Sequence, residues 1–230
     1  SSSHALFGGY GGAAVAKAGF SAIIVARWTK TLIFIVLAPL IALMVGLMLM
    51  SSIFWIFRDT APSRVARGFR FMQLTSAAAY SLMHGANRAQ KTMGIIAGAL
   101  FTGGYLSTFH VPLWVVLIAH AAIGLGTLSG GWRIIKTMGQ KITKLLTPGG
   151  FAAETGAAVA IYVATALGVG ISTTHTLTGA IVGVGATRRL SAVRWGVARQ
   201  IVWAWILTIP ASATIGASTY LLLQFVRRWV

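Results

Sequence analysis

The stretch that decides the fold runs from Thr31 to Phe57 and reads TLIFIVLAPLIALMVGLMLMSSIFWIF. It contains no charged residue. A helix needs about 20 predominantly apolar residues to cross the roughly 30 Å of hydrocarbon in a bilayer. This segment by itself therefore predicts a membrane-spanning helix.

The composition of the whole chain agrees with that prediction. Of its 230 residues, 57% are hydrophobic and only 9% are charged, and the mean hydropathy is +0.80. Soluble domains carry about 25% charged residues, because water must wet their surface. We therefore expect an all-α protein whose outer surface faces a lipid bilayer.

Four further segments have the length and apolarity of crossings. They are residues 71–105, 111–130, 151–170 and 201–225. Residues 5–16 and 176–186 are also apolar but too short to cross, and each suits one half of a re-entrant hairpin. The predicted fold is thus a set of polytopic transmembrane helices with broken helices and re-entrant hairpins.

The charges are strongly unbalanced, with 19 Lys and Arg against two acids and a net charge of +17. Twelve of the basic residues fall in three clusters between apolar segments, at 58–70, 133–144 and 188–199. This spacing is typical of cytoplasmic loops under the positive-inside rule. We expect a multi-pass protein of the cell inner (plasma) membrane that binds no nucleic acid.

Several chemistries are excluded or disfavoured by composition. The chain has no cysteine, which excludes disulfides and thiolate metal sites. With only Asp59 and Glu154 as acids, hydrolysis by paired carboxylates is disfavoured. No metal site and no enzyme activity are predicted. The glycine pairs Gly94/Gly98, Gly126/Gly130 and Gly179/Gly183 have the spacing of close helix packing.

An internal repeat appears at an offset of 171 residues. Residues 1–8 (SSSHALFG) align with residues 172–179 (STTHTLTG), and Pro39 aligns with Pro210. Three full predicted crossings and the rest of a hairpin separate the copies, and the odd number inverts the second copy. Inverted repeats are common in secondary transporters.

The repeat divides the chain into three parts. Residues 1–57 are the tail of the first repeat, residues 58–70 form a basic cytoplasmic loop, and residues 71–230 form the second repeat. The second repeat contains a predicted break at 84–91 and a hairpin at 151–187. Because the repeated motif opens at Ser1, we expect the rest of the first repeat upstream of it.

Polar residues interrupt the apolar segment 71–105, where residues 84–91 read HGANRAQK. Ionisable residues at membrane depth are costly and mark functional sites. Gly85 is expected to break the helix, leaving backbone amides free to bind an anion. The alternative is a solvated loop between two shorter helices.

Two other polar features admit two interpretations each. The hydroxyls of Ser172, Thr173 and Thr174 can wrap an oxyanion, or they can cap a helix. Glu154 is the only acid in an apolar segment. It can bind a coupling ion or a proton, or it can be a first-turn acid that the helix dipole favours.

These segments resemble the PiT family of inorganic phosphate transporters, in its bacterial low-affinity form. The resemblance rests on HGAN at 84–87, QKTMG at 90–94, GFAAET at 150–155, STTH at 172–175 and GATRRLSAVRWG at 185–196. It covers nearly the whole chain as the family's C-terminal portion. It implies an ion-coupled phosphate symporter that works by alternating access, often as a homodimer, in the lipid bilayer.

The resemblance also implies roles for individual residues. Phosphate, or a metal-phosphate complex, would be bound by Asn87, Gln90, Lys91, Ser172, Thr173 and Thr174, together with Ser1, Ser2 and Ser3. Glu154 and His84 would serve the coupling ion, H⁺ or Na⁺, and no other cofactor is implied.

Arg88 departs from the family pattern, because the signature has an aspartate at this position. A guanidinium cannot coordinate a cation, although it attracts phosphate. Two alternatives therefore stay open. One is a transporter of another oxyanion such as sulfate, and the other is a truncated membrane protein that does not transport.

Overall fold

The computed structural model describes residues 2–140 and 142–229, and every regular element in these ranges is a helix. The elements are α1 (Ser2–Ala18), η1 (Phe20–Ala22), α2 (Val25–Ile56), α3 (Pro62–Thr102), α4 (Leu113–Gln140), α5 (Thr147–Ala166), α6 (Thr173–Ala186), η2 (Leu190–Ala192) and α7 (Trp195–Arg227). The prediction of an all-α fold is confirmed.

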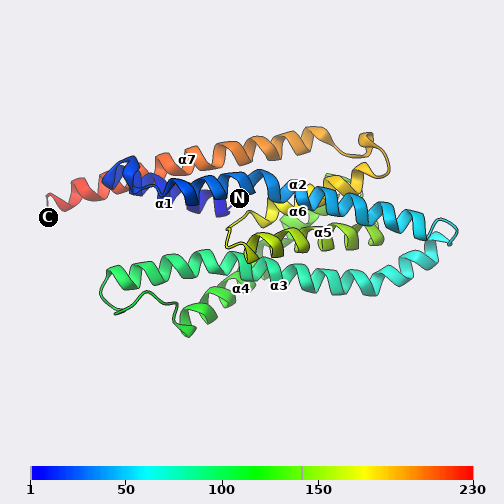
Figure 1. Ribbon diagram of the computed structural model, residues 1–230, viewed down its shortest axis with the longest axis horizontal. Coiled ribbons are helices and arrows are strands. Elements are labelled where there is room, and N and C mark those ends of the chain that lie inside the picture. Colours follow the sequence, from blue (N-terminus) through cyan, green and yellow to red (C-terminus); the bar gives the residue numbers. More distant parts are fainter. Residues whose placement is uncertain (1, 141, 230) are drawn as a thin grey trace.

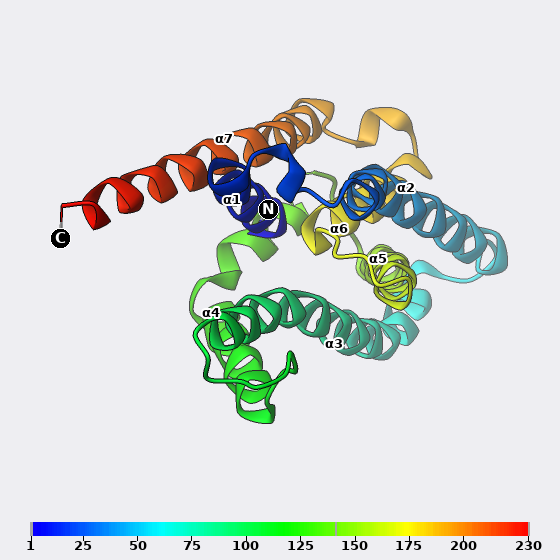
Figure 2. The same cartoon turned by 60° about the vertical axis from the view of Figure 1, so that its left-hand side comes forward.

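The long helices α2, α3 and α7 lie along the longest dimension of the molecule (Figure 1). The shorter helices α1 and α6 begin near its middle and run towards opposite ends. Helix α1 packs against α7, and α6 packs against α2 and α5. Figure 2 shows α2, α5 and α6 as one packed group, with α3 beside α5.

Within the described residues, three helices are long and apolar enough to cross a membrane, over Val25–Ile56, Leu113–Trp132 and Trp195–Arg227. Large apolar side chains on them face outwards: Val36, Leu128 and Leu223 are 61%, 84% and 61% exposed. Exposed apolar surface on this scale marks contact with lipid or protein. The surface of the molecule therefore matches a membrane protein.

Helices α3 and α5, which contain the other two predicted crossings, do not reach that apolarity. Helix α5 packs against α2, α3 and α6, and small residues such as Gly149, Ala153, Ala157 and Ala160 are buried along it. Helix α3 carries the polar segment 84–91. A helix that faces protein need not be as apolar as one that faces lipid, so both can carry polar side chains.

Helices α1 and α6 approach their partners at glycines. A Cβ atom at Gly179 or Gly183 would overlap the backbone carbonyl of Pro39 or Leu43 on α2. Likewise, a Cβ atom at Gly12 would overlap the carbonyl of Ala213 on α7. Glycine is required for backbones to come this close, as at other membrane helix crossings.

The predicted packing role holds for one glycine pair of three. It is confirmed for Gly179/Gly183. It is wrong for Gly94/Gly98 and Gly126/Gly130, because an added Cβ at these four positions would meet no atom within 4 Å.

The predicted break at residues 84–91 is wrong, and so is the alternative of a solvated loop there. Helix α3 is continuous from Pro62 to Thr102. A lone glycine such as Gly85 costs a helix only about 1 kcal/mol relative to alanine. No proline follows Pro62 in this helix to force a break, and its polar side chains find partners on neighbouring helices.

The hairpin predicted at 151–187 corresponds to α5 and α6, which pack against each other across a connection at 167–172. Helix α5 begins earlier than predicted, at Thr147, with Pro148 in its first turn. Proline is favoured there because its missing N–H has no partner to lose.

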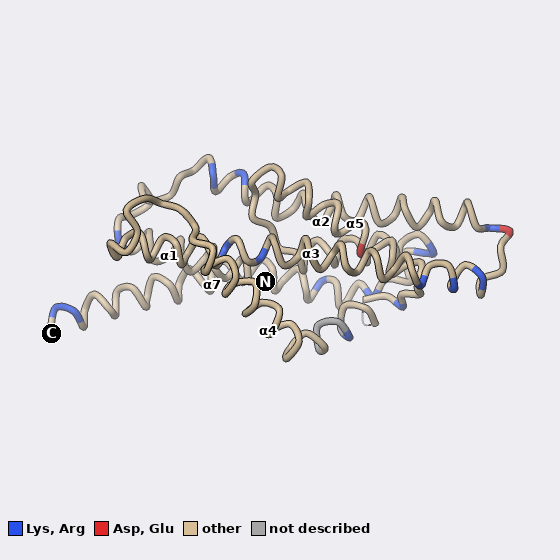
Figure 3. The backbone as a smooth tube through the Cα atoms, turned by 90° about the horizontal axis from the view of Figure 1, so that it is seen from below, with Lys and Arg blue, Asp and Glu red and all other residues tan. Residues whose placement is uncertain are grey.

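Most Lys and Arg residues lie in the half of the molecule that holds the α2–α3 connection (Figure 3). The connection between α6 and α7 reaches the same end. The basic clusters thus lie mostly in one half of the molecule, but the predicted loop at 58–70 is wrong from Pro62 onwards, where α3 begins. A smaller group lies near the middle of the molecule, where α3 passes the start of α1.

Replacing Gly183 by alanine is expected to destabilise the protein. The new methyl group would force α6 away from the Leu43 carbonyl, and overpacking of this kind costs about 1–3 kcal/mol. The melting temperature should fall by about 2–4 °C per kcal/mol. Gly98→Ala is the control: it has open space and should be neutral or slightly stabilising. Melting is monitored by circular dichroism in detergent. Equal melting temperatures for Gly183→Ala and the unmodified protein would contradict the packing role.

Candidate functional site

The first turns of α1 and α6 meet in the middle of the molecule. The rings of His4 and His175 lie edge to face with centroids 4.3 Å apart. The Ser3 hydroxyl donates a hydrogen bond to the Ile171 carbonyl at 3.2 Å. Two helix N-termini, each with the positive end of a helix dipole, thus lie side by side.

The start of α6 is capped by its own chain. Ser172 is the N-cap, and its Oγ accepts a hydrogen bond from the backbone N–H of His175 at 3.4 Å. The side chain of Thr173 is buried, whereas that of Thr174 is half-buried. The capping interpretation therefore holds for Ser172. The hydroxyls of the other two residues are not needed for that cap.

Lys91 of α3 connects these N-termini to the rest of the fold. Its Nζ donates to Asn87 Oδ1 at 2.8 Å, to Ser3 Oγ at 3.0 Å and to the Ile171 carbonyl at 2.7 Å. The other end of the Asn87 amide donates to Thr165 Oγ1 of α5 at 3.0 Å. Helices α1, α3 and α5 and the 167–172 connection therefore meet around one ammonium group.

Arg88 lies on the same side of α3 and also reaches α1. Its Nη2 donates to the hydroxyl of Ser2, and its Nη1 lies 3.4 Å from His84 Nε2. A guanidinium can only donate, so Nε2 of His84 is the acceptor and Nδ1 carries the proton. We call Ser2, Ser3, Asn87, Arg88 and Lys91 the central cluster.

The central cluster has two cations and no carboxylate. The two acids of the chain have other partners: Asp59 pairs with Arg58 on the surface, and Glu154 Oε2 accepts a hydrogen bond from Ser76 at 2.6 Å. Positive charge removed from water is costly unless an opposite charge compensates for it. The central cluster is therefore suited to bind an anion.

Glu154 lies well away from the central cluster. The Ser76–Glu154 and Asn87–Thr165 hydrogen bonds both join α3 to α5 with a separation of 78 residues. The two helices are therefore parallel, and the bonds are about 16 Å apart along them at 1.5 Å per residue. Glu154 instead lines an open pocket of about 340 Å³ with Arg70, Gln73 and Thr147.

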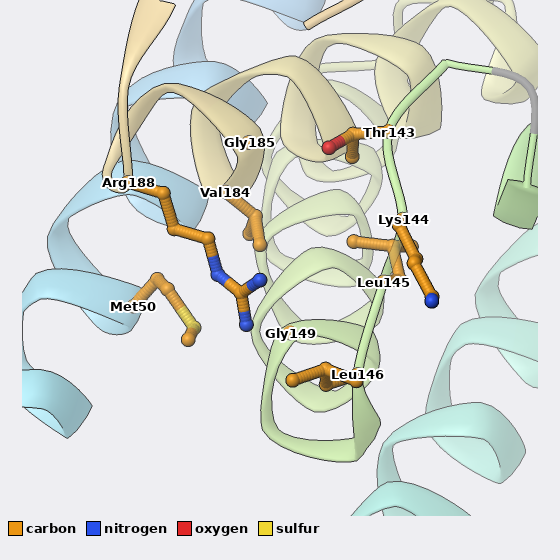
Figure 4. A pocket seen from close by; sticks show the side chains of 9 residues that line it. All are labelled: Met50, Thr143, Lys144, Leu145, Leu146, Gly149, Val184, Gly185 and Arg188. Carbon is orange, nitrogen blue, oxygen red and sulfur yellow. The ribbon is translucent and has the colours of Figure 1, made fainter. Parts of the chain in front are cut away.

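A second pocket lies between α2, α5 and α6 (Figure 4). Its walls include Met50, Leu145, Leu146 and Val184, and the guanidinium of Arg188 extends along it. Its volume is only about 10 Å³, which is room for one water molecule at most. We assign it no ligand.

The structure brings together only part of the predicted site. Hydrogen bonds join Arg88 to Ser2, and Lys91 to Ser3 and Asn87. The adjacent helix α6 follows its N-cap Ser172, with Thr173 and Thr174 in its first turn. Gln90 is exposed on α3, and Glu154 is in a separate pocket. Ser1 lies outside the described residues.

Two members of the hydrogen-bond network were not predicted from sequence. Thr165 lies eleven residues after Glu154, or about three helical turns, so it shares the face of α5 that packs on α3. That spacing could have identified it. The Ile171 carbonyl could not be identified, because a backbone carbonyl has no residue-type signal.

The apolar exterior and the positively charged interior define a helical membrane protein with an anion-attracting centre. A sequence profile for the phosphate transporter family matches residues 1–216. The chain belongs to this family, which confirms the resemblance drawn from its motifs.

Relatives with the same description occur in distant bacteria. The chain is 56% identical over 221 residues to a "probable low-affinity inorganic phosphate transporter" of Rhizobium meliloti, covering 96% of this chain and 66% of the relative. It is 41% identical to proteins of the same name in Bacillus subtilis and Mycobacterium tuberculosis, covering 98% of this chain and 68% and 55% of theirs. The chain thus spans between about half and two thirds of these relatives.

A solved structure titled "The sodium-dependent phosphate transporter" has a similar fold. Its TM-score to this chain is 0.65 at 24% identity, covering 97% of this chain and 64% of the other. At this identity the likeness concerns the fold.

The Asn87–Thr165 hydrogen bond should be measurable by a double-mutant cycle. We expect Asn87→Ala to lower the free energy of unfolding more than Thr165→Val, because it also removes an acceptor from the half-buried Lys91 ammonium. The coupling free energy between the two positions should be about 0.5–1.5 kcal/mol. Unfolding curves of the protein in detergent measure these changes. If the two single changes in the free energy of unfolding add up to that of the double variant, the two side chains do not interact.

Proposed function

We propose that this chain carries out inorganic phosphate transport, as an ion-coupled symporter that holds phosphate between the N-termini of α1 and α6. The observation that carries the proposal is the positive charge of the central cluster, which has no carboxylate partner. Phosphate supplies the missing negative charge together with four oxygens that accept hydrogen bonds. The names of the bacterial relatives support this substrate.

The groups around the central cluster match the chemistry of phosphate. Helix N-termini bind phosphate through backbone N–H groups and the helix dipole. Arg88 can donate two parallel hydrogen bonds to phosphate oxygens, and the hydroxyls of Ser2, Thr173 and Thr174 can add neutral donors. Arg88 would then exchange its bond to Ser2 for the substrate. Gln90 would join only after moving inwards from its exposed position.

We further propose that α1–α2 and α6–α7 are the two halves of an inverted repeat. Each half has a short helix, a 3-10 turn and a long helix that contains a proline, Pro39 or Pro210. Each short helix packs against the long helix of the other half through glycines. Rocking of such halves about a central site is the usual basis of alternating access.

The coupling ion, H⁺ or Na⁺, is assigned to Glu154 and His84, which lie at two separate places on the α3–α5 pair. Glu154 lies in an open pocket with Arg70, so ions can reach it without passing the central cluster. His84 lies beside Arg88. A multi-pass location in the inner membrane, with the basic connections in the cytoplasm, and assembly as a homodimer complete the proposal.

The hydroxyls at the start of α6 provide one test. Thr173→Ala combined with Thr174→Ala should reduce radiolabelled phosphate uptake into proteoliposomes to background, because the substrate loses two donors at once. Thr214→Ala is the matched control, since that hydroxyl bonds only to Pro210 within α7 and uptake should be unchanged. Full uptake in the double variant, with normal protein insertion, would overturn the site assignment.

Arg88 provides a second test. Arg88→Ala should weaken phosphate binding to the purified protein about 10- to 100-fold, because a charge-assisted hydrogen bond is lost. Arg88→Lys should bind with intermediate affinity, and Arg199→Ala, exposed on α7, should bind normally. Calorimetric titration with phosphate measures these changes.

The radiolabelled uptake assay also tests the substrate. If equimolar sulfate reduces the uptake of labelled phosphate as strongly as unlabelled phosphate does, a general oxyanion transporter is favoured instead.

A further inference from the structure

The Lys91 ammonium has a complete set of hydrogen-bond partners within the protein. An ammonium has three N–H donors, and Lys91 Nζ makes three hydrogen bonds of 2.7–3.0 Å, to Ile171, Asn87 and Ser3. A phosphate oxygen could bond directly to Lys91 only by displacing one of these oxygens. In this conformation Lys91 therefore acts on an anion through its charge, whereas Arg88 is placed to contact it.

The three partners of Lys91 are all neutral oxygens. They are a side-chain amide, a hydroxyl and a backbone carbonyl, without any nitrogen or sulfur. Oxygen ligands of this kind suit hard cations in proteins. The set lacks a carboxylate, so it matches a cation of charge +1 rather than a divalent ion.

The oxygens are fixed in position by other contacts. Asn87 is 2% exposed, and its Nδ2 is held by Thr165, which directs Oδ1 towards Lys91. Ser3 Oγ is bound to the Ile171 carbonyl as well as to Lys91. The lysine stem also has little freedom, because a Cβ atom added at Gly170 would lie 3.1 Å from Lys91 Cε. The oxygens would therefore stay grouped if the ammonium were removed.

We propose that Lys91 is a tethered cation that occupies a monovalent-cation site built from Ser3, Asn87 and the Ile171 carbonyl. While the ammonium is in place, Na⁺ cannot enter this site. Loss of the ammonium opens the site to Na⁺, which then takes over the charge that faces the phosphate. The link to phosphate rests on the proposed function, whereas the cation site does not.

Lys91→Ala tests the cation site directly. Purified protein is melted in NaCl and in choline chloride at equal ionic strength, without phosphate. The unmodified protein sets the baseline, because Na⁺ bound elsewhere, such as at Glu154, shifts its melting temperature and that of the variant alike. The variant should melt about 2–4 °C higher in Na⁺ at roughly five times its Kd, because a ligand that binds only the folded state stabilises it.

Lys30→Ala is the matched control. The Lys30 ammonium also donates to a backbone carbonyl of the α5–α6 connection, that of Leu167, at 2.8 Å, but it lies on an exposed side chain. Its removal should create no difference between Na⁺ and choline. If Lys91→Ala cannot be purified, Lys91→Met keeps most of the side-chain volume, and the same comparison of salts decides.

The outcomes separate this inference from the proposed function. A folded Lys91→Ala or Lys91→Met variant with equal melting temperatures in both salts would overturn the tethered cation, even if the unmodified protein takes up phosphate. A sodium-specific rise in the variant alone would support it, even if phosphate uptake were absent. A sodium-specific rise of equal size in the unmodified protein and the variant would also overturn it, because the effect would then not depend on removing the ammonium.

Discussion

The ammonium of Lys91 is the point at which the central helices come together. Its three hydrogen bonds join α1, α3 and the α5–α6 connection. These segments are far apart in sequence and share few other polar contacts. An ammonium group that is partly removed from water loses stabilising free energy for each donor that has no partner. Together with the Ser3–Ile171 hydrogen bond, Lys91 thus holds the first turn of α1 and the connection before α6 on the same side of α3.

Glycine sets the second constraint, because it decides how close the short helices come to the long ones. At Gly12, Gly179 and Gly183 the facing atoms belong to the backbone, not to movable side chains. Such contacts fix the position of α1 on α7 and of α6 on α2 along the helix axes. That position in turn determines where the two N-termini meet, and hence where Ser2 and Thr173 lie relative to Arg88. The polar centre therefore depends on apolar packing some turns away.

Much of the fold could be predicted from sequence, because uninterrupted apolar length has a direct physical meaning in a bilayer. The segment from Thr31 to Phe57 lies within α2 almost as predicted. The wrong prediction of a helix break at 84–91 has an equally physical origin: Gly85 and polar residues within an apolar segment favour a break when one helix is considered alone. Their side chains instead find partners across helix boundaries, as Asn87 does with Thr165. Such partners depend on tertiary packing, which residue type and spacing along one helix do not reveal.

For the site, sequence identified residue types better than groupings. Asn87, Lys91 and Ser3 were expected to act together, and they are in contact. Glu154 is predicted to serve the same transport cycle, yet it lies about 16 Å along α5 from Thr165, the partner of Asn87. The parallel packing of α3 and α5 gives a physical link between the two places, since the same helix pair carries Ser76 with Glu154 at one level and Asn87 with Thr165 at the other. A shift of α3 against α5 that followed ion binding at Glu154 would change the Asn87 contact, and through it the oxygens that surround Lys91. Under the proposed function, coupling between ion and phosphate would need no shared ligand, only a helix interface in which both polar pairs are made or broken together.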